Sequence, residues 1–359
     1  MSKNNQQKTN SYPERLERGK KQKSSQPIRV AINGLGRIGR AVFKIALENP
    51  KIKIVAINDL TDNQTLAHLL KYDSVYGAYK KDVSSDKKNL YVDKAKYPVY
   101  ALPEPVKLPW KKLNVDVVLE CTGRFVKDGA ARAHIKAGAK KVIISAPAKG
   151  KGNVPTYLIG VNADKYQGEN LISMASCTTN SIAPVTKIID ENFGIKQAFL
   201  TTIHSYTANQ NLVDGPHKDL RRARAAAYNI VPTTTGATHA VIKAMPKLKD
   251  RFEGIAVRVP TICGSLSDLV YLVRTKTNAK KVNAVLKKAS QTKALKGILG
   301  VTEEPLVSTD IIKSGCSTLV DLLSTQVLGG NLIKVLTWYD NEWAYSKRLV
   351  EMVEIVAQK

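Results

Sequence analysis

The sequence has few cysteines and no long apolar run, and both features limit the classes of protein to which the chain can belong. No segment approaches the about 18 consecutive apolar residues that a membrane-spanning helix needs, so no membrane partner is expected. The first residues also lack the apolar core of a secretory signal. The four cysteines among 359 residues form no CxxC pair, which indicates free thiols rather than a disulfide framework or a metal site. We therefore expect a cytoplasmic protein without a bound metal.

Acidic residues are scarce relative to basic ones. The chain has 30 Asp and Glu against 56 Lys and Arg, a formal charge of +26. Residues 1–29 hold eight of the basic and two of the acidic residues, so most of the excess belongs to the rest of the chain. This balance favours anionic partners such as phosphorylated metabolites and nucleotides. No motif interleaves aromatic residues with the charges, so nucleic-acid binding or surface adhesion remains only a secondary alternative.

The order of apolar patterns predicts two folded parts after a polar arm. Residues 1–26 lack large apolar residues and are expected to form a disordered basic arm. Over residues 27–176, buried-strand patterns such as IRVAING and KIKIVAIND alternate with helical ones such as GRAVFKIALEN, TLAHLLKYD and KDGAARAHIKAG. This alternation predicts an α/β fold with a doubly wound parallel sheet. Over residues 177–340, longer strands predict a more antiparallel sheet with a few helices, and an amphipathic helix ends the chain.

A glycine-rich turn follows the first predicted strand. Gly34, Gly36 and Gly39 have GxGxxG spacing between a strand and a helix, which is typical of dinucleotide-binding Rossmann domains. Asp59 ends the next strand, 20 residues after Gly39, where a carboxylate would hold the adenosine ribose. A carboxylate there repels a 2′-phosphate, so NAD is favoured over NADP. The alternative is an ordinary strand-to-helix turn followed by a strand-end aspartate.

Cys177 precedes a predicted helix in the stretch ASCTTNS. A helix N-terminus stabilises a thiolate, so this cysteine is a candidate nucleophile. Of the five histidines, His204 lies at the end of a strand-like run in the second half and is the best candidate base. His68 and His134 lie in predicted helices and are interpreted as packing or surface residues. Spacing alone leaves a buried core cysteine and a hydrogen-bonded histidine as an open alternative.

A basic, hydroxyl-rich segment comes next. Hydroxyls, a glycine amide and guanidinium groups together suit phosphate oxygens, although a solvated basic loop would have the same composition. The candidate residues are Arg221, Arg222, Arg224, Thr233, Thr234, Thr235, Gly236 and Arg258.

These motifs together resemble the glyceraldehyde-3-phosphate dehydrogenase family, of the phosphorylating bacterial type. The resemblance runs in order over residues 28–359, and ASCTTN with WYDNEW is its most specific part. The other motifs that carry it are INGLGRIGR, CTGRF, ISAPAK, HSYT, DLRRARAA and VPTTTGA.

The resemblance implies a mechanism and a set of site residues. Cys177 would attack the aldehyde of glyceraldehyde 3-phosphate to give a thiohemiacetal, with His204 as the base. Oxidation by NAD would leave a thioester, which inorganic phosphate would convert to 1,3-bisphosphoglycerate, a step of glycolysis and gluconeogenesis. The implied cofactor-binding residues are Gly34, Gly36, Arg37, Ile38, Gly39, Asp59, Thr122, Ser145 and Asn341. The implied substrate- and phosphate-binding residues are Ser176, Thr178, Thr207, Arg222, Thr235, Gly236 and Arg258.

The family also implies a homotetramer in which residues 341–359 pack back on the nucleotide-binding domain. Two related enzymes are the alternatives: an erythrose-4-phosphate dehydrogenase and a semialdehyde dehydrogenase that shares the cysteine chemistry. The phosphate-binding set and WYDNEW argue against the semialdehyde enzyme.

Three positions depart from the family pattern. Asn209 replaces a common Asp, Met174 replaces the usual Asn before ASCTTN, and ALPEP lacks an Arg often found near the adenine. Pro216 is retained, as in NAD-type enzymes, whereas Gly215 leaves room for some use of NADP.

Overall fold

The computed structural model describes residues 26–359. Apart from residue 26, the expected disordered arm lies outside the described residues. Within them no helix is long and apolar enough to cross a membrane. The four cysteines are all free thiols.

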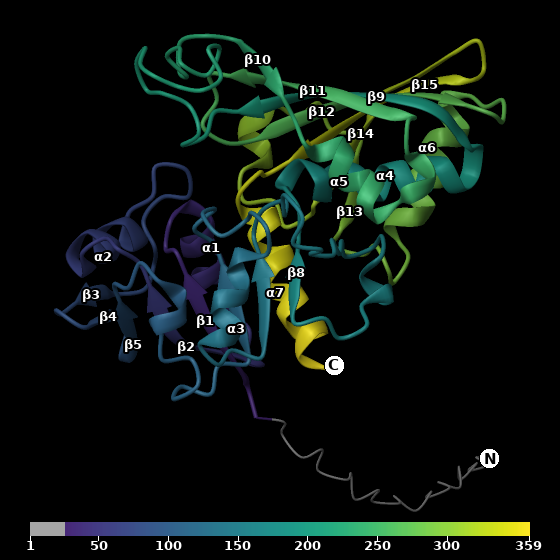
Figure 1. Cartoon of the computed structure of the whole chain (residues 1–359). Helices are drawn as coiled ribbons and strands as arrows, with labels where there is room; N and C mark the ends of the chain where they lie inside the picture. The colour runs from purple at the N-terminus through teal and green to yellow at the C-terminus, as the bar shows by residue number, and fades with distance from the viewer. Residues whose placement is uncertain (1–25) are drawn as a thin grey trace, which may run out of the picture.

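The first part of the chain forms an eight-stranded sheet with the order β3-β4-β5-β2-β1-β6-β7-β8 (Figure 1). From β5 to β8 all neighbouring strands run parallel, whereas β3 and β4 form an antiparallel edge. This confirms the expected doubly wound parallel sheet. The strands are β1 (Ile28–Asn33), β2 (Ile52–Asn58), β3 (Val83–Ser85), β4 (Asn89–Val92), β5 (Ala95–Tyr100), β6 (Val117–Glu120), β7 (Lys141–Ile144) and β8 (Leu171–Ser173).

Helices cover this sheet because its central strands are apolar on both faces. One core joins Ile32 of β1, Val42 of α1 (Arg37–Ala46) and Leu349 of α7 (Trp343–Ala357). The last helix of the chain therefore packs beside the first, and Figure 1 shows it in yellow among the blue and purple elements. The other helical segments here are α2 (Asn63–Lys71), α3 (Ala133–Lys136) and the 3₁₀ turns η1 (Pro105–Lys107), η2 (Ala130–Arg132) and η3 (Ala163–Lys165).

The helix predicted from KDGAARAHIKAG is shorter than expected. Only η2 and the single turn α3 form there. Gly129 and Gly138 adopt φ values of +72° and +105°, in the region that glycine alone enters readily. The helical segment therefore begins after Gly129 and ends before Gly138.

The second part forms a seven-stranded sheet with the order β10-β11-β9-β12-β15-β14-β13. Four of its six pairings are antiparallel, while β9 with β11 and β13 with β14 run parallel. A mostly antiparallel sheet is thus confirmed. Its strands are β9 (Ile195–Ser205), β10 (Val231–Thr234), β11 (Phe252–Val259), β12 (Ser265–Val273), β13 (Leu299–Thr302), β14 (Thr318–Leu328) and β15 (Leu332–Tyr339).

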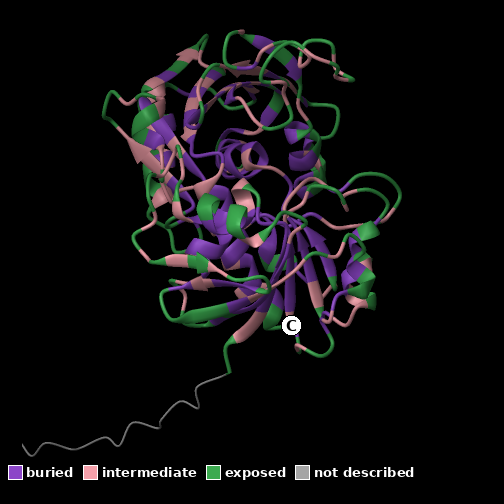
Figure 2. Cartoon of the chain, turned by 90° about the vertical axis from the view of Figure 1, so that its left-hand side faces the viewer, coloured by how far each residue is buried: buried purple, intermediate pink, exposed green. Residues whose placement is uncertain are grey.

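Helices lie on one face of the second sheet only, between it and the first sheet (Figure 1). Leu200 of β9 packs into a core with Ile182 of α4, while Phe199 of β9 and Ile255 of β11 remain exposed on the opposite face. Figure 2 shows buried residues gathered along the strands and inner helices of both parts. The helical segments are α4 (Cys177–Phe193), α5 (Ala237–Ala244), α6 (Ala279–Ser290), η4 (Pro246–Leu248) and η5 (Ser308–Ile311).

Candidate active site

The glycine turn between β1 and α1 is shaped for close approach of an anion. Gly34 has φ +93°, and a Cβ there would lie 2.9 Å from Thr122. A Cβ on Gly39 would lie 1.9 Å from the Gly34 carbonyl oxygen, so helix and strand could not pack as they do. Gly36 precedes the helix without a side-chain cap and faces open space. The first-turn amides, including those of Arg37 and Ile38, are therefore available to a pyrophosphate.

Asp59 lies beside this turn at the end of β2. Its Oδ2 accepts from the Leu35 amide at 2.6 Å, and its Oδ1 accepts from the Thr61 amide at 2.9 Å. A cavity of about 300 Å³ is lined by Asp59, Gly34, Gly36 and Thr122. Because the carboxyl ends of parallel strands meet here at the sheet's switch point, the cavity fits the adenosine part of a dinucleotide. Ser145 follows β7 at the same edge.

A buried polar network lies beneath this cavity, and the sequence analysis did not identify it. The Glu120 carboxylate accepts from Asn33 Nδ2 at 2.5 Å and from the Thr122 amide at 2.8 Å. The indole N–H of Trp110 can only donate, so His134 Nδ1 accepts from it at 3.0 Å and Nε2–H donates to Glu120 at 2.9 Å. His134 is therefore a fully buried member of this network rather than a surface residue. The network holds the ends of β1 and β6 under the cofactor site.

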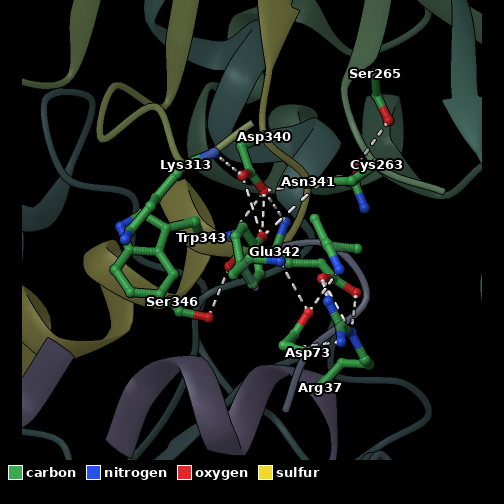
Figure 3. A network of polar contacts seen from close by, with 12 residues as sticks. Arg37, Asp73, Cys263, Ser265, Lys313, Asp340, Asn341, Glu342, Trp343 and Ser346 are labelled. Atoms are coloured by element: carbon green, nitrogen blue, oxygen red, sulfur yellow. Dashed lines mark hydrogen bonds and ion pairs between the residues drawn. The ribbon is translucent and has the colours of Figure 1, made fainter. Parts of the chain in front are cut away.

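Asn341 follows β15 in the turn before α7. Its Oδ1 accepts from Ser265 Oγ at 3.0 Å (Figure 3), while its Nδ2 makes no hydrogen bond with any residue of 26–359. A free amide donor on a side chain whose orientation is fixed suits a carboxamide oxygen. The residues at this position therefore fit the nicotinamide end of NAD.

The turn that carries Asn341 is tied to the first domain by charged and polar contacts, also drawn in Figure 3. Arg37 bonds Glu342 at 2.5 Å and Asp73 at 2.8 Å, so its side chain joins α1, the loop after α2 and this turn. Asp340 accepts from Tyr76 Oη at 2.9 Å and from the amides of Glu342 and Trp343. Composition and spacing gave no signal for the contacts of Arg37 with Glu342 and of Tyr76 with Asp340, because these partners lie far apart in the sequence.

Cys177 is the first residue of α4, as expected. Ser176 caps the helix by accepting from the Thr179 amide at 3.1 Å. Ala175 before it has φ +54°, and its carbonyl oxygen accepts from Tyr345 Oη of α7 at 2.8 Å. The thiol is thus placed at a helix N-terminus on a sharply turned segment that α7 fixes from the first domain.

The structure brings His204 to Cys177, with Nε2 3.5 Å from Sγ. His204 Nδ1 lies 2.6 Å from the Ser205 carbonyl oxygen and 2.7 Å from Arg258 Nη1. The carbonyl can only accept, and it also receives Arg258 Nη1 at 3.0 Å. With the proton on Nδ1, the ring donates to this carbonyl and the Nε2 lone pair faces the thiol; the guanidinium can only donate, so its close approach to Nδ1 is then not a hydrogen bond. This is the tautomer that a base acting on Cys177 requires.

Charges around the pair act on both groups. Burial and the Arg258 guanidinium lower the pKa of His204 to about 3, so the imidazole is neutral at pH 7. Burial raises the pKa of the Cys177 thiol, while Arg258 and the hydrogen bonds of Thr178 act in the opposite direction. Arg258 is thus the nearest positive charge available to a thiolate here, and it pairs directly with His204 across β9 and β11.

The structure places the other candidate anion-binding residues in different surroundings. Arg222 donates from Nε to Thr233 Oγ1 at 2.8 Å and from Nη2 to the Thr234 carbonyl at 3.1 Å. Burial lowers the pKa of Arg258, and the Arg222 charge adds a smaller effect in the same direction. Thr178 Oγ1 lies 2.9 Å from Tyr339 Oη in a buried contact. Thr235 and Gly236 precede α5, and a Cβ on Gly236 would meet open space.

Thr207 lies in the loop after β9, where no contact joins its side chain to Cys177, His204 or Arg258. Arg221 and Arg224 are exposed or half-buried rather than held near the thiol, and Arg224 pairs with Asp214 at 2.7 Å. Among residues 26–359 no cluster of His, Cys, Asp and Glu could hold a metal ion.

The three positions that depart from the family pattern lie in different surroundings. Met174 is fully buried in the core of the first domain, and its carbonyl oxygen accepts from Asn180 Nδ2 at 2.8 Å. Asn209 is exposed and bonds His217 at 3.3 Å. Leu102 and Pro103 of ALPEP line the adenosine cavity. The amide of Gly215 donates to the Ala223 carbonyl at 2.9 Å.

Fold and site together define a class: two-domain dehydrogenases in which a Rossmann domain presents a dinucleotide to a cysteine on a second domain. The chain matches the family model for the glyceraldehyde 3-phosphate dehydrogenase NAD-binding domain over residues 28–128 and that for the C-terminal domain over residues 176–341. The chain therefore belongs to the glyceraldehyde-3-phosphate dehydrogenase family.

Several curated proteins that are similar to this chain are named glyceraldehyde-3-phosphate dehydrogenase. The glyceraldehyde-3-phosphate dehydrogenase of Thermotoga maritima is 54% identical over 331 residues, which is 91% of this chain and 98% of that protein. That of Geobacillus stearothermophilus is 52% identical over 334 residues, covering 92% of this chain and 99% of its own length. Glyceraldehyde-3-phosphate dehydrogenase 1 of Bacillus subtilis is 51% identical over 334 residues, with the same coverage.

Proposed function

We propose that this chain catalyses the phosphorylating oxidation of D-glyceraldehyde 3-phosphate to 1,3-bisphosphoglycerate with reduction of NAD, in glycolysis and gluconeogenesis. The observation that carries the proposal is the contact of Cys177 Sγ with Nε2 of His204 beside Arg258. Membership of the family supports this substrate and this cofactor. So do relatives with about 50% sequence identity that are named glyceraldehyde-3-phosphate dehydrogenase.

Cys177 is the proposed nucleophile, and His204 moves the protons. Nε2 takes the thiol proton as sulfur attacks the aldehyde carbon, and it returns that proton to the carbonyl oxygen to give a thiohemiacetal. Nε2 then takes the hydroxyl proton as the C–H bond breaks, leaving a thioester on Cys177. NAD, when bound, supplies the acceptor for the hydride. An oxygen of inorganic phosphate finally attacks the thioester carbon, and the Cys177 thiolate leaves.

A sulfur nucleophile suits this sequence because the thioester retains the free energy of oxidation for the acyl phosphate. We assign the substrate phosphate to Thr207 and Arg258. The attacking phosphate and the substrate would be held by Ser176, Thr178, Arg222, Thr235 and Gly236. Support for this set comes from the open amide end at Gly236 and from the mutual electrostatic influence of Arg222 and Arg258.

For the cofactor, we assign the pyrophosphate to the amides of Arg37 and Ile38 in the turn of Gly34, Gly36 and Gly39. Asp59 would hold the ribose, and Asn341 would orient the nicotinamide amide. Thr122 and Ser145 would line the cleft. The corresponding domains are residues 27–176 with helix 341–359, and residues 177–340.

A cytoplasmic homotetramer is part of the proposal. Its support is the uncovered face of the second sheet, where Phe199 and Ile255 are 64% and 51% exposed. Exposed apolar side chains on a sheet face are typical of an interface between subunits. Free thiols at all four cysteines support a reducing compartment.

Turnover on three aldehydes tests the choice of substrate. Initial rates of NAD reduction would be compared for glyceraldehyde 3-phosphate, erythrose 4-phosphate and an unphosphorylated semialdehyde, all with inorganic phosphate. A kcat/KM highest for glyceraldehyde 3-phosphate is expected. Equal or higher values for either of the other two would overturn the assignment.

A further inference from the structure

A second cavity lies between the C-terminal part of α1, the loop after α2 and the start of α7, which follows the turn that carries Asn341. Its volume is about 370 Å³, and its walls include Lys44, Tyr76, Tyr79, Lys313 and Trp343. None of the residues assigned to substrate, phosphate or cofactor lines it. A volume of this size holds a phosphate group together with a small organic moiety.

Lys44 is the unusual member of this wall. The residue is only 5% exposed, yet its ammonium makes no hydrogen bond or ion pair with any residue from 26 to 359. Its nearest recorded partner is the Tyr79 ring, whose centroid lies 4.9 Å from Nζ. Nζ keeps access to solvent through the cavity, but the residue as a whole is largely desolvated, and an ammonium without a counter-charge is costly in such a place. Burial accordingly lowers the pKa of Lys44, and Arg40, Arg37 and Lys313 lower it further, while Asp73 acts against them.

The neighbouring groups are mostly donors without acceptors. Tyr79 Oη is buried and has no hydrogen-bond partner among the described residues. Lys313 Nζ lies over the Trp343 ring at 5.3 Å and forms no ion pair there. Lys80 is likewise unpaired within residues 26–359, whereas Lys81 pairs with Asp93 at 2.8 Å.

Carboxylates do not neutralise this group of cations. Glu48 is the only carboxylate among the residues that line the cavity, and it is exposed. Asp73 is occupied by Arg37. The cavity thus has an excess of positive charge and of unused donors, which a phosphate-bearing anion would satisfy.

We propose that this cavity is a second anion site, in which Lys44, Tyr79 and Lys313 bind a phosphate group separately from the catalytic phosphate. Tyr76 and Trp343 form the wall between this site and the Asp340–Asn341 turn. The site is independent of the reaction proposed above, since none of its three binding residues touches Cys177 or His204.

Phosphate-dependent stabilisation of the full-length, NAD-saturated protein tests this site. Thermal unfolding and calorimetric titration would be followed with inorganic phosphate at constant ionic strength for wild type, Lys44→Met, Lys44→Arg and Lys112→Met. Lys112 is an exposed lysine far from the cavity wall, so Lys112→Met repeats the charge change alone. The calorimetric count separates the proposed site from the phosphate positions at the catalytic centre, because those positions remain in every variant.

The proposal predicts one phosphate fewer per chain in Lys44→Met, or affinity at that site reduced about tenfold or more. Without phosphate, Lys44→Met should unfold at a higher temperature than wild type, because it removes an unpaired charge from a largely desolvated position. Lys44→Arg and Lys112→Met should keep the second phosphate. An unchanged count in Lys44→Met, or an equal loss in Lys112→Met, would overturn the proposal.

Trp343 fluorescence gives a local readout of the same event. Emission would be titrated with phosphate and with glycerol 3-phosphate, and the signal of Trp343→Phe would be subtracted to remove the other two tryptophans. A saturable change that Lys44→Met abolishes supports the site, and the tighter of the two ligands identifies whether inorganic or organic phosphate is the better occupant. A response that sodium chloride reproduces at equal ionic strength would contradict it.

Discussion

The Nε2 atom of His204 lies 3.5 Å from the Sγ of Cys177, and its Nδ1 atom lies 2.6 Å from the Ser205 carbonyl oxygen. The two residues come from different elements, the first turn of α4 and the end of β9. Their contact supports the proposed roles of Cys177 as the nucleophile and His204 as its base.

Removing the base should slow the chemical step. We expect His204→Asn to lower kcat by about 10²- to 10⁴-fold with little change in the affinity for NAD, because the imidazole does not contact the dinucleotide cavity. Steady-state kinetics and NAD titration check this. A variant that retains kcat within a factor of about three would show that His204 is not the base.

Arg258 should control the reactivity of the thiol. Its positive charge favours the thiolate of Cys177 and disfavours the imidazolium of His204. In Arg258→Met the pKa of Cys177 should therefore rise, and the pKa of His204 should rise as well. The pH dependence of alkylation by iodoacetamide, measured in the absence of ligands, should shift toward alkaline pH. A shift toward acid pH would contradict this electrostatic assignment.

Tyr76 should position Asn341 through Asp340. Its hydroxyl donates to Asp340 at 2.9 Å, whereas the hydroxyl of the nearby Tyr79 has no partner. Tyr76→Phe should weaken NAD binding by about tenfold or more, the worth of a hydrogen bond to a charged group, because the turn that carries Asn341 loses a contact that fixes it. ADP-ribose, which lacks nicotinamide, should bind as before.

Tyr79→Phe is the matched control, since it deletes a tyrosine hydroxyl from the same loop without breaking a hydrogen bond. It should leave NAD affinity unchanged. Equal weakening of NAD and ADP-ribose in Tyr76→Phe would mean that the loop as a whole is disturbed and that Asn341 is not specifically positioned.

Asp59 should determine the choice between NAD and NADP. Its two carboxylate oxygens accept backbone amides and point into the adenosine cavity, where they would repel a 2′-phosphate. Asp59→Ala should reduce kcat/KM for NAD by about 10- to 100-fold and reduce that for NADP much less. Parallel kinetics with both cofactors measure this ratio. An unchanged ratio would show that Asp59 does not determine the choice between NAD and NADP.

Local patterns in the sequence were sufficient for much of the fold and for naming Cys177 and His204 as candidates. Gly34 and Gly39 specify a turn that admits no larger residue, and Ser176 caps the helix that begins at Cys177. Such signals lie within a few residues of the structure that they determine. The switch of apolar spacing near residue 176 likewise separated the parallel from the antiparallel sheet.

Long-range side-chain contacts could not be predicted in this way. Tyr76 meets Asp340 across 264 residues, and Arg37 meets Glu342 across 305. The packing alternative holds for His134, but a short helical pattern does not reveal that Trp110 and Glu120 approach the ring from two sides. These contacts depend on how the strands and α7 pack, which only the folded chain defines.

Reduction of NAD at 340 nm with glyceraldehyde 3-phosphate, with and without inorganic phosphate, tests the central claim most directly when wild type is compared with Cys177→Ser. The account predicts sustained, phosphate-dependent turnover in wild type and its loss in the variant, with NAD still bound. Turnover that persists in Cys177→Ser, or that is as fast without phosphate, would contradict a thioester on Cys177.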